Sequence, residues 1–508
     1  MKYRILSAVL SLIVALNFCS CDSENESYVF KSVIYGNPKT LDPQCALQDS
    51  SYSVIYNVFQ GLFSFGENGE TVNGMIDSYE ISNDGKIWTF MLKEGIKWSD
   101  GDKFEAECTA EDYVFAFQRL FKPATKSKRA SEYYIIKNAR SINNGEISDL
   151  SELGVIAKDK YILELTLEEP CSDLKALLAL PPAMPCNEEF YIGTQGRYGL
   201  DADCIASNNN YYVYSWNYDE WSNDNNYFIL RRNLLNNNSD ILPTGINFFI
   251  NPANEYDDFD NEILHTYTGY SEKEIPDLMK KYQYSEHCSG IYGFIFNHNG
   301  SFSELDYRVE LSQCVKTEGN YGIIPDCVVI GDDNYRQLAG DISNIVSYFK
   351  SDVGVINDAK MILPEFDSLS DEISTVIQKW QSECNFYCNI VKLDTVEYLN
   401  ALQNGDFDIA LIELSGEYNS PYAYLNDFLD RNSQNYSGYS NKKFNHIMNS
   451  AFTASDSETA TAYYKEAEQL LIDDAVFVPL SPKKEYVFYS SKIINVYYNP
   501  FLGIFSFK

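Results

Sequence analysis

The chain has 508 residues, of which 45% are hydrophobic, and its formal net charge at pH 7 is −34. This length exceeds what one compact core usually serves, so it predicts two or three domains. A surface this acidic repels nucleic acid and anionic lipid headgroups, which argues against a nucleic-acid-binding role. We attribute the acidity to solubility rather than to a cationic ligand.

The N-terminus has the pattern of a secretion signal. A short basic start precedes an apolar run over residues 5–18, which is too short to span a membrane comfortably, and polar residues follow. This pattern predicts a cleaved signal peptide at residues 1–20 and a protein that works outside the cytoplasm. Ser20 followed by Cys21 further resembles a bacterial lipoprotein signal, whose peptidase cuts before the cysteine that carries the lipid. The alternative is an ordinary cleaved signal with a chance cysteine.

The remaining cysteines are spread along the chain from Cys45 to Cys388. Outside the cell they can form disulfides, or a low-redox habitat can leave them free, and the pairing cannot be read from the sequence. Cys384 and Cys388 are four residues apart, but no second Cys or His pair lies near them. We therefore expect no zinc site, and the four scattered histidines give no reason to expect another metal or a cofactor.

Hydrophobic periodicity predicts helices and strands in alternation. Apolar residues at helical spacing predict helices at 53–63, 110–120, 373–382, 396–403 and 458–472. Alternating or continuous apolar runs predict strands at 33–35, 86–92, 161–167, 291–297, 388–393, 407–412 and 476–479. Asn83-Asp84-Gly85 is a strong hairpin turn, and Asn404-Gly405 is a good helix stop. Strands alternating with helices, clearest in the last third, predict an α/β fold.

Several segments, in the same order, resemble one protein family. The strongest runs from Asp84 to Gly101 and reads DGKIWTFMLKEGIKWSDG. The others are Asn37 to Pro43 (NPKTLDP), Asn57 to Phe63 (NVFQGLF), Asn404 to Asp408 (NGDFD) and Ala467 to Leu480 (AEQLLIDDAVFVPL). Together they resemble the solute-binding proteins of peptide-type ABC importers, the oligopeptide- and dipeptide-binding family 5. The chain looks like a divergent member of that family.

This resemblance implies a three-lobed, periplasmic-binding-protein-like fold of the class II, or cluster C, type. It would contain mixed sheets and hold a ligand in a cleft between two lobes that close about a hinge. We predict a lipid-anchored tether at 21–32 and a discontinuous domain I. The predicted domains are 33–65 with 185–265 and 480–508 (domain I), 66–184 (domain II) and 266–479 (domain III).

The resemblance also implies the function. We expect a lipid-anchored receptor, monomeric, on the outer face of the cell membrane or in the periplasm. It would capture peptides and deliver them to the permease and ATPase subunits of an ABC importer. Two alternatives are a receptor for a nickel chelate, haem or an oligosaccharide, and a surface lipoprotein that has lost transport. We expect no enzyme, because the chain has no G-x-S-x-G, H-E-x-x-H or P-loop motif.

One family motif carries the candidate site. Many peptide-binding members place the aspartate of Ala-Asp-Tyr-Asn-x-Pro against the ammonium of the ligand, and this chain has Gly416 to Pro421 (GEYNSP) at that point. Glu417 replaces the aspartate and reaches about one methylene further. The predicted ligand-binding residues are Ser415, Gly416, Glu417, Tyr418 and Asn419. Leu414 stands where a tryptophan is usual and Leu411 where some members have a cation, so we expect the cleft to lack an aromatic wall and a partner for the ligand's carboxylate.

Overall fold

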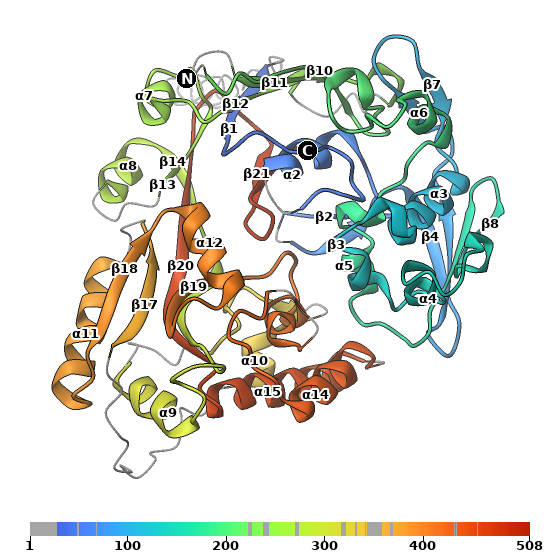
Figure 1. Cartoon of the computed structure of the whole chain (residues 1–508). Coiled ribbons are helices and arrows are strands. Elements are labelled where there is room, and N and C mark those ends of the chain that lie inside the picture. The colour runs from blue at the N-terminus through green and yellow to red at the C-terminus, as the bar shows by residue number, and fades with distance from the viewer. Residues whose placement is uncertain are drawn as a thin grey trace, which may run out of the picture.

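The computed structural model describes residues 28–47, 50–67, 69–221, 226–236, 243–269, 274–315, 322–330, 333–340, 342, 358–365, 369–430, 432, 434–454 and 456–507. The predicted signal peptide and Cys21 lie outside the described residues. Three larger sheets, each with its own helices, form the body of the molecule (Figure 1). Every helix in the described residues is too short or too polar to span a bilayer.

The N-terminal sheet joins segments that are far apart in the chain. Its strand order is β1 (Val29–Ile34), β12 (Gly245–Ile250), β11 (Tyr227–Arg232) and β10 (Tyr211–Asn217). β1 runs parallel to β12, and the other neighbours are antiparallel. A parallel pair needs a crossover connection, and here that connection contains all strands of the middle sheet, β4 (Ile76–Ile81), β5 (Ile87–Leu92), β8 (Val155–Asp159) and β9 (Ile162–Thr166).

Helix α2 (Ser50–Val58) lies beside the N-terminal sheet and is shorter than predicted. The sequence predicted a helix through residue 63, but the chain leaves the helix after residue 58. Asn209, from the turn before β10, donates its amide to the carbonyls of Tyr56 and Phe59, each at 3.0 Å. These bonds satisfy carbonyl groups that would otherwise lack a partner at the helix end, so a distant residue decides where α2 stops.

The second region, here called the middle sheet, has the order β4 (Ile76–Ile81), β5 (Ile87–Leu92), β9 (Ile162–Thr166) and β8 (Val155–Asp159), all antiparallel. Its helices are α3 (Ala110–Phe121), α4 (Ala139–Asn143), α5 (Leu174–Leu177) and α6 (Glu188–Gly193). Two small ladders pair β2 (Phe63–Phe65) with β3 (Thr71–Asn73) and β6 (Lys97–Ser99) with β7 (Glu105–Glu107). The predicted strands at 86–92 and 161–167 and the predicted helix at 110–120 are confirmed.

The large sheet has the order β13 (Thr266–Gly269), β20 (Phe477–Tyr489), β14 (Gln283–Phe296), β19 (Ile409–Ser415), β17 (Ala359–Pro364) and β18 (Cys388–Leu393). β17 runs parallel to both β18 and β19. The helices of this part of the chain are α7 (Glu255–Asp260), α8 (Ile275–Lys281), α9 (Leu305–Cys314), α10 (Tyr335–Ala339), α11 (Ser370–Glu383), α12 (Thr395–Asn404), α13 (Pro421–Leu425), α14 (Lys442–Phe452) and α15 (Ser457–Asp473). Two short ladders pair β15 (Val329–Ile330) with β16 (Asp333–Asn334) and β21 (Val496–Asn499) with β22 (Ile504–Phe507).

Helix α12 shows how local sequence sets an element. Asp394 accepts hydrogen bonds from the backbone N–H groups of Val396 and Glu397, both at 2.9 Å, and begins the helix as its N-cap. Gly405 ends it in the left-handed conformation, with φ of 66°, which glycine adopts without a steric cost. The stop predicted at Asn404-Gly405 is therefore confirmed.

Strands β14 and β20 of the large sheet are long and extend toward the N-terminal sheet (Figure 1). Backbone bonds join the two sheets at His265, whose N–H donates to Lys31 (2.8 Å) and whose carbonyl accepts from Ser490 (2.9 Å). Ser32 on β1 and Thr266 on β13 also share a hydrogen bond of 2.8 Å. The predicted domain boundaries stay predictions, and β20 runs across the one at residue 480.

Candidate functional site

A cavity of about 390 Å³ lies where the N-terminal and large sheets meet, and we call it the cleft cavity. β1 contributes Ser32 to Ile34 to its wall, and β19 and β20 contribute alternate side chains. The segment between β21 and β22 closes part of the remaining wall. Strands from two separate sheets therefore line one cavity, which is a usual setting for a ligand site.

Alternation along β19 decides which of its side chains reach the cleft cavity. Glu413 and Ser415 line it, whereas Leu414 is 1% exposed and packs in the core on the opposite face. Leu411 is also buried, at 2% exposure. The expectation that Leu414 leaves the cleft without an aromatic wall does not describe this cavity, because residue 414 faces away from it.

The charges of the cleft cavity are predominantly acidic. Its lining contains Glu255, Glu413, Glu485 and Lys483. Lys483 pairs with Glu413 at 2.8 Å, and Glu413 also accepts a hydrogen bond from the Ser415 hydroxyl at 2.9 Å. Burial lowers the pKa of Lys483, but the two neighbouring carboxylates at 413 and 485 outweigh that effect, and the pKa is raised overall. Lys483 is therefore charged, and the lining carries an excess of negative charge.

The other two acids of this lining are held by tyrosines. Glu255 accepts hydrogen bonds from the Tyr35 hydroxyl at 2.8 and 3.0 Å, and burial raises the pKa of Glu255. Glu485 is 4% exposed and accepts from the Tyr498 hydroxyl at 2.9 Å. Tyr35 follows β1 and Tyr498 lies on β21, so residues from both ends of the chain position these carboxylates.

Of the predicted ligand-binding residues, Ser415 lines the cleft cavity and the four that follow it form a packed turn after β19. The Asn419 side chain accepts from the Val329 N–H at 2.8 Å, and Tyr418 is 5% exposed. A Cβ atom on Gly416 would come within 2.7 Å of the Tyr424 ring, so only glycine fits there. Glu417 keeps a partly exposed side chain, at 29%.

Glu417 belongs to a second group of charges, which we call the Arg129 cluster and which comprises Tyr52, Arg129, Glu132 and Glu417. Arg129 pairs with Glu417 and also binds Glu132 through two hydrogen bonds, of 2.9 and 2.7 Å. The Tyr52 hydroxyl contacts the same guanidinium group. The sequence did not predict Arg129, which lies 288 residues before Glu417 in a polar segment without a motif.

The Arg129 cluster holds one more negative than positive charge. Burial raises the pKa of Glu417, although Arg129 pulls it in the opposite direction. Burial, with a smaller contribution from Glu417, also raises the pKa of the nearby Asp427 to about 7. An additional cation close to Glu417 would be favoured on electrostatic grounds.

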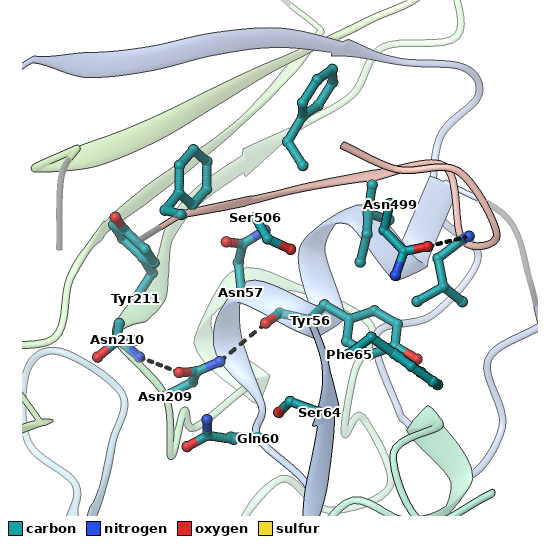
Figure 2. A pocket seen from close by; sticks show the side chains of 14 residues that line it. Tyr56, Asn57, Gln60, Ser64, Phe65, Asn209, Asn210, Tyr211, Asn499 and Ser506 are labelled. Carbon is teal, nitrogen blue, oxygen red and sulfur yellow. Dashed lines mark hydrogen bonds between the residues drawn. The ribbon is translucent and has the colours of Figure 1, made fainter. Parts of the chain in front are cut away.

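A second cavity, of about 150 Å³, lies between α2, the turn before β10 and the β21–β22 hairpin (Figure 2). Two of its amide side chains are used by the chain: Asn209 binds backbone groups of Tyr56 and Asn210, and Asn499 accepts from Leu502. Because this cavity is smaller and two of its amides serve the fold, the cleft cavity is the better candidate site.

Comparison with known proteins shows which chains this one is similar to. The model of a family described as "Bacterial extracellular solute-binding proteins, family 5 Middle" matches residues 70–233. The oligopeptide-binding protein OppA of Bacillus subtilis is 25% identical over 87% of this chain and 85% of its own length. The periplasmic oligopeptide-binding protein OppA of Escherichia coli is also 25% identical, over 92% of this chain and 88% of its own.

Solved structures agree on the fold. The murein tripeptide binding protein MppA of Escherichia coli superimposes with a TM-score of 0.74, covering 95% of this chain and 99% of its own, at 20% identity. Listeria monocytogenes OppA bound to peptide gives the same TM-score at 19% identity, covering 95% and 98% of the two chains. The fold is thus the three-lobed, periplasmic-binding-protein-like α/β fold that the sequence predicted. The family model over residues 70–233 and the relatives that are 25% identical over most of the chain together support its assignment as a divergent member of the bacterial extracellular solute-binding proteins, family 5.

Proposed function

We propose that this chain captures peptides in the cleft cavity outside the cytoplasm and delivers them to an ABC-type importer. The observation that carries the proposal is the place of the cavity, whose walls come from both the N-terminal and the large sheet. The relatives named above, the OppA proteins of two bacteria, are oligopeptide-binding proteins. The volume of about 390 Å³ lies within the usual range for small-molecule sites.

Strand β19 gives the bound peptide a direction in this proposal. Glu413 and Ser415 line the cavity, and Glu417 follows two residues later. A peptide lying along β19 would present its backbone to the strand and its amino terminus to Glu417. Backbone N–H and C=O groups repeat in every peptide, so such a site accepts many side chains.

Arg129 changes the role that we assign to Glu417. The carboxylate of Glu417 already binds Arg129 through Oε2, so a ligand ammonium would share it rather than occupy it alone. Arg129 is also held by Glu132 and need not leave. One added ammonium would neutralise the Arg129 cluster, which supports Glu417 as the residue that receives the amino terminus of the ligand.

We further propose that the two long strands β14 and β20 act as the hinge between the lobes, because they extend through the large sheet and β20 pairs with β13, whose Thr266 bonds to Ser32 of β1. Closure about them would bury a ligand from both sides. The division into domains I to III, with the boundaries predicted above, belongs to this proposal, as does a monomeric receptor.

Thermal unfolding of the mature chain with a peptide library tests the function. A ligand bound only by the folded state stabilises it by RT ln(1 + [L]/Kd), so cognate peptides raise Tm. We expect free peptides to raise Tm more than their N-acetylated forms, and Glu417→Gln to remove that preference. Equal stabilisation by free and acetylated peptides would exclude Glu417 as the ammonium site.

The acidic lining separates peptides from the other solutes that the sequence left open. Haem carries propionate groups, which the carboxylates at 255, 413 and 485 would repel. Adding haem, a nickel chelate and an oligosaccharide to the same screen compares the classes directly. If one of these solutes raises Tm and none of the peptides does, that solute replaces peptides as the proposed ligand.

We propose that lipid on Cys21 holds the mature protein at the outer face of the cell membrane. The support is the sequence pattern around Ser20 and Cys21. One acyl group binds membranes only marginally, whereas two or more anchor a protein stably, so a diacylated cysteine suffices. Cells fed a labelled fatty acid should label the wild type, and Cys21→Ser should lose both the label and the membrane fraction.

A further inference from the structure

Two cysteines of the large-sheet region lie with their sulfur atoms side by side. Cys314 is the last residue of α9, and Cys384 is the C-cap of α11. Their Sγ atoms are 2.7 Å apart, which is roughly 0.7 Å longer than a disulfide bond of about 2.05 Å. The structure describes both as free cysteines, Cys314 buried and Cys384 partly exposed.

The two helix ends are held in this position by other contacts. The Trp380 indole N–H of α11 donates to the Leu311 carbonyl of α9 at 2.9 Å, and Trp380 is 1% exposed. Both thiols also approach the Glu310 carbonyl, Cys314 at 3.6 Å and Cys384 at 3.8 Å. The sulfur atoms therefore meet because the packing of α9 on α11 brings them together, and bond formation requires little movement.

The contact also makes the two thiols unequal. The hydrogen bond between them lowers the pKa of Cys314 and raises that of Cys384. The thiolate is the reactive form of cysteine, so Cys314 is the better nucleophile of the pair.

We propose that Cys314 and Cys384 form a disulfide bond in the mature protein. The Cys314 thiolate attacks a sulfur of an external disulfide, from a small molecule or an oxidoreductase, and one thiolate leaves. The Cys384 sulfur then attacks the mixed disulfide at Cys314 and loses its proton, and the second thiolate leaves. Two thiols are thus oxidised to one disulfide, while the external disulfide is reduced to two thiols.

The bond would close a long segment of the chain, since the two cysteines are 70 residues apart. A cross-link of this span restricts the unfolded chain strongly and stabilises the fold. The two thiols pack in the apolar cluster that contains Phe294, Leu411 and Trp380, and no described residue of that cluster lines the cleft cavity, so the proposal does not depend on the peptide-binding role.

Other cysteines of the chain provide controls. Cys388, at the start of β18, contacts the Met361 sulfur at 4.0 Å. Cys327 donates its thiol to the Cys288 carbonyl at 2.6 Å. These contacts place Cys388 against a thioether and Cys327 against a backbone oxygen, so neither thiol has the sulfur-to-sulfur geometry of the proposed pair.

Peptide mapping tests the pairing. The mature chain is first oxidised with glutathione disulfide. It is then unfolded in the presence of N-ethylmaleimide, which alkylates free thiols, and is digested with trypsin without reductant. Residues 309–316 contain Cys314, and residues 380–392 contain both Cys384 and Cys388. Cys388→Ser removes this ambiguity, and we expect it to retain the cross-linked pair of peptides. Peptides 309–316 and 380–392 found unlinked and alkylated in this variant would overturn the proposal.

Thermal stability provides a second measurement on the same samples. We expect reduction to lower Tm by roughly 5 °C or more, as a cross-link of this length predicts for a lobe of this size. Cys314→Ser should have the Tm of the reduced wild type whether or not reductant is present. The Tm of Cys388→Ser should still fall when reductant is added. An oxidised wild type that is no more stable than its reduced form would contradict a stabilising disulfide.

Discussion

The cleft cavity and the Arg129 cluster each hold a carboxylate on β19 or just after it, paired with a distant cation. Lys483 faces open space beside Glu413, and their side chains are 19% and 33% exposed. Arg129 is instead enclosed, at 5% exposure, and is fixed by Glu132 and Tyr52 as well as by Glu417. The same kind of ion pair is thus open to exchange of its cation in one place, whereas its cation is fixed in the other. Its surroundings decide, because only the exposed pair can exchange partners without leaving a buried charge.

The largest expected effect is on stability, from Arg129→Met. Removing Arg129 leaves Glu132 and Glu417 without their shared partner, and because both carboxylates are partly exposed we expect a loss in the free energy of unfolding of about 2–4 kcal/mol, somewhat less than for a fully buried pair. Urea unfolding at pH 7 measures it. Lys483→Met is the matched control, since a partly exposed pair contributes at most about 1 kcal/mol. Equal losses in the two variants would show that the pairs do not differ as described.

The alternation of β19 predicts the next effect. Leu414→Trp adds bulk to a position that is 1% exposed, and we expect a loss of about 1–3 kcal/mol from overpacking. Peptide affinity should stay unchanged, because residue 414 faces away from the cleft cavity. Calorimetric titration beside urea unfolding separates the two effects. A gain in affinity from this substitution would instead place residue 414 in the site.

Asp427 tests the excess negative charge near the Arg129 cluster. Its folded-state pKa of about 7 lies above the unfolded value of about 3.9, so the folded state holds the proton more tightly. The contribution of this group is therefore fully present below about pH 4 and is lost as the pH rises to about 7. We expect Asp427→Asn to remove this loss of stability with rising pH, so that its free energy of unfolding at pH 8 exceeds that of the wild type by about 1–2 kcal/mol. Unfolding curves at pH 5 and pH 8 measure it, and no difference between the variants at pH 8 would contradict the assignment.

Lys483→Met should change the stability of the fold least. Its main effect should be on the affinity for charged peptides. It removes the positive charge of the cleft-cavity lining, so cationic peptides should bind about tenfold more tightly and anionic peptides about tenfold more weakly, or about 1.4 kcal/mol each way. Isothermal titration with two peptides that differ only in charge measures the split. A change of the same sign for both peptides would mean that Lys483 acts through packing.

Sequence reasoning worked best where short-range chemistry decides the structure. The strand at 388–393 was predicted with the bounds of β18, and the Asn404-Gly405 stop ends α12 as expected. It worked less well where a distant segment intervenes. α2 ends five residues earlier than predicted, where Asn209 binds the carbonyls of Tyr56 and Phe59. The sequence near residue 58 gives no sign of that contact.

The same division runs through the candidate site. The motif around Glu417 and the position of Ser415 could be read from the sequence, and Ser415 does line the cleft cavity. The pairing of Glu417 with Arg129 could not, because the two residues are separated by 288 positions and the arginine belongs to no motif. The orientation of Leu414 required the pairing of β19 with β14, since a shift of one residue exchanges the two faces of a strand.

The motifs of this chain indicated its resemblance to family 5, and turn residues and apolar periodicity, which act over a few positions, indicated the α/β alternation and the local stops. The three-dimensional packing was needed to show which charges meet, which face of β19 borders the cleft cavity and which two cysteines approach one another. These depend on packing between segments that lie from 70 to 288 residues apart, and the energy of a charge or a thiol is set by its neighbours in space rather than in the chain.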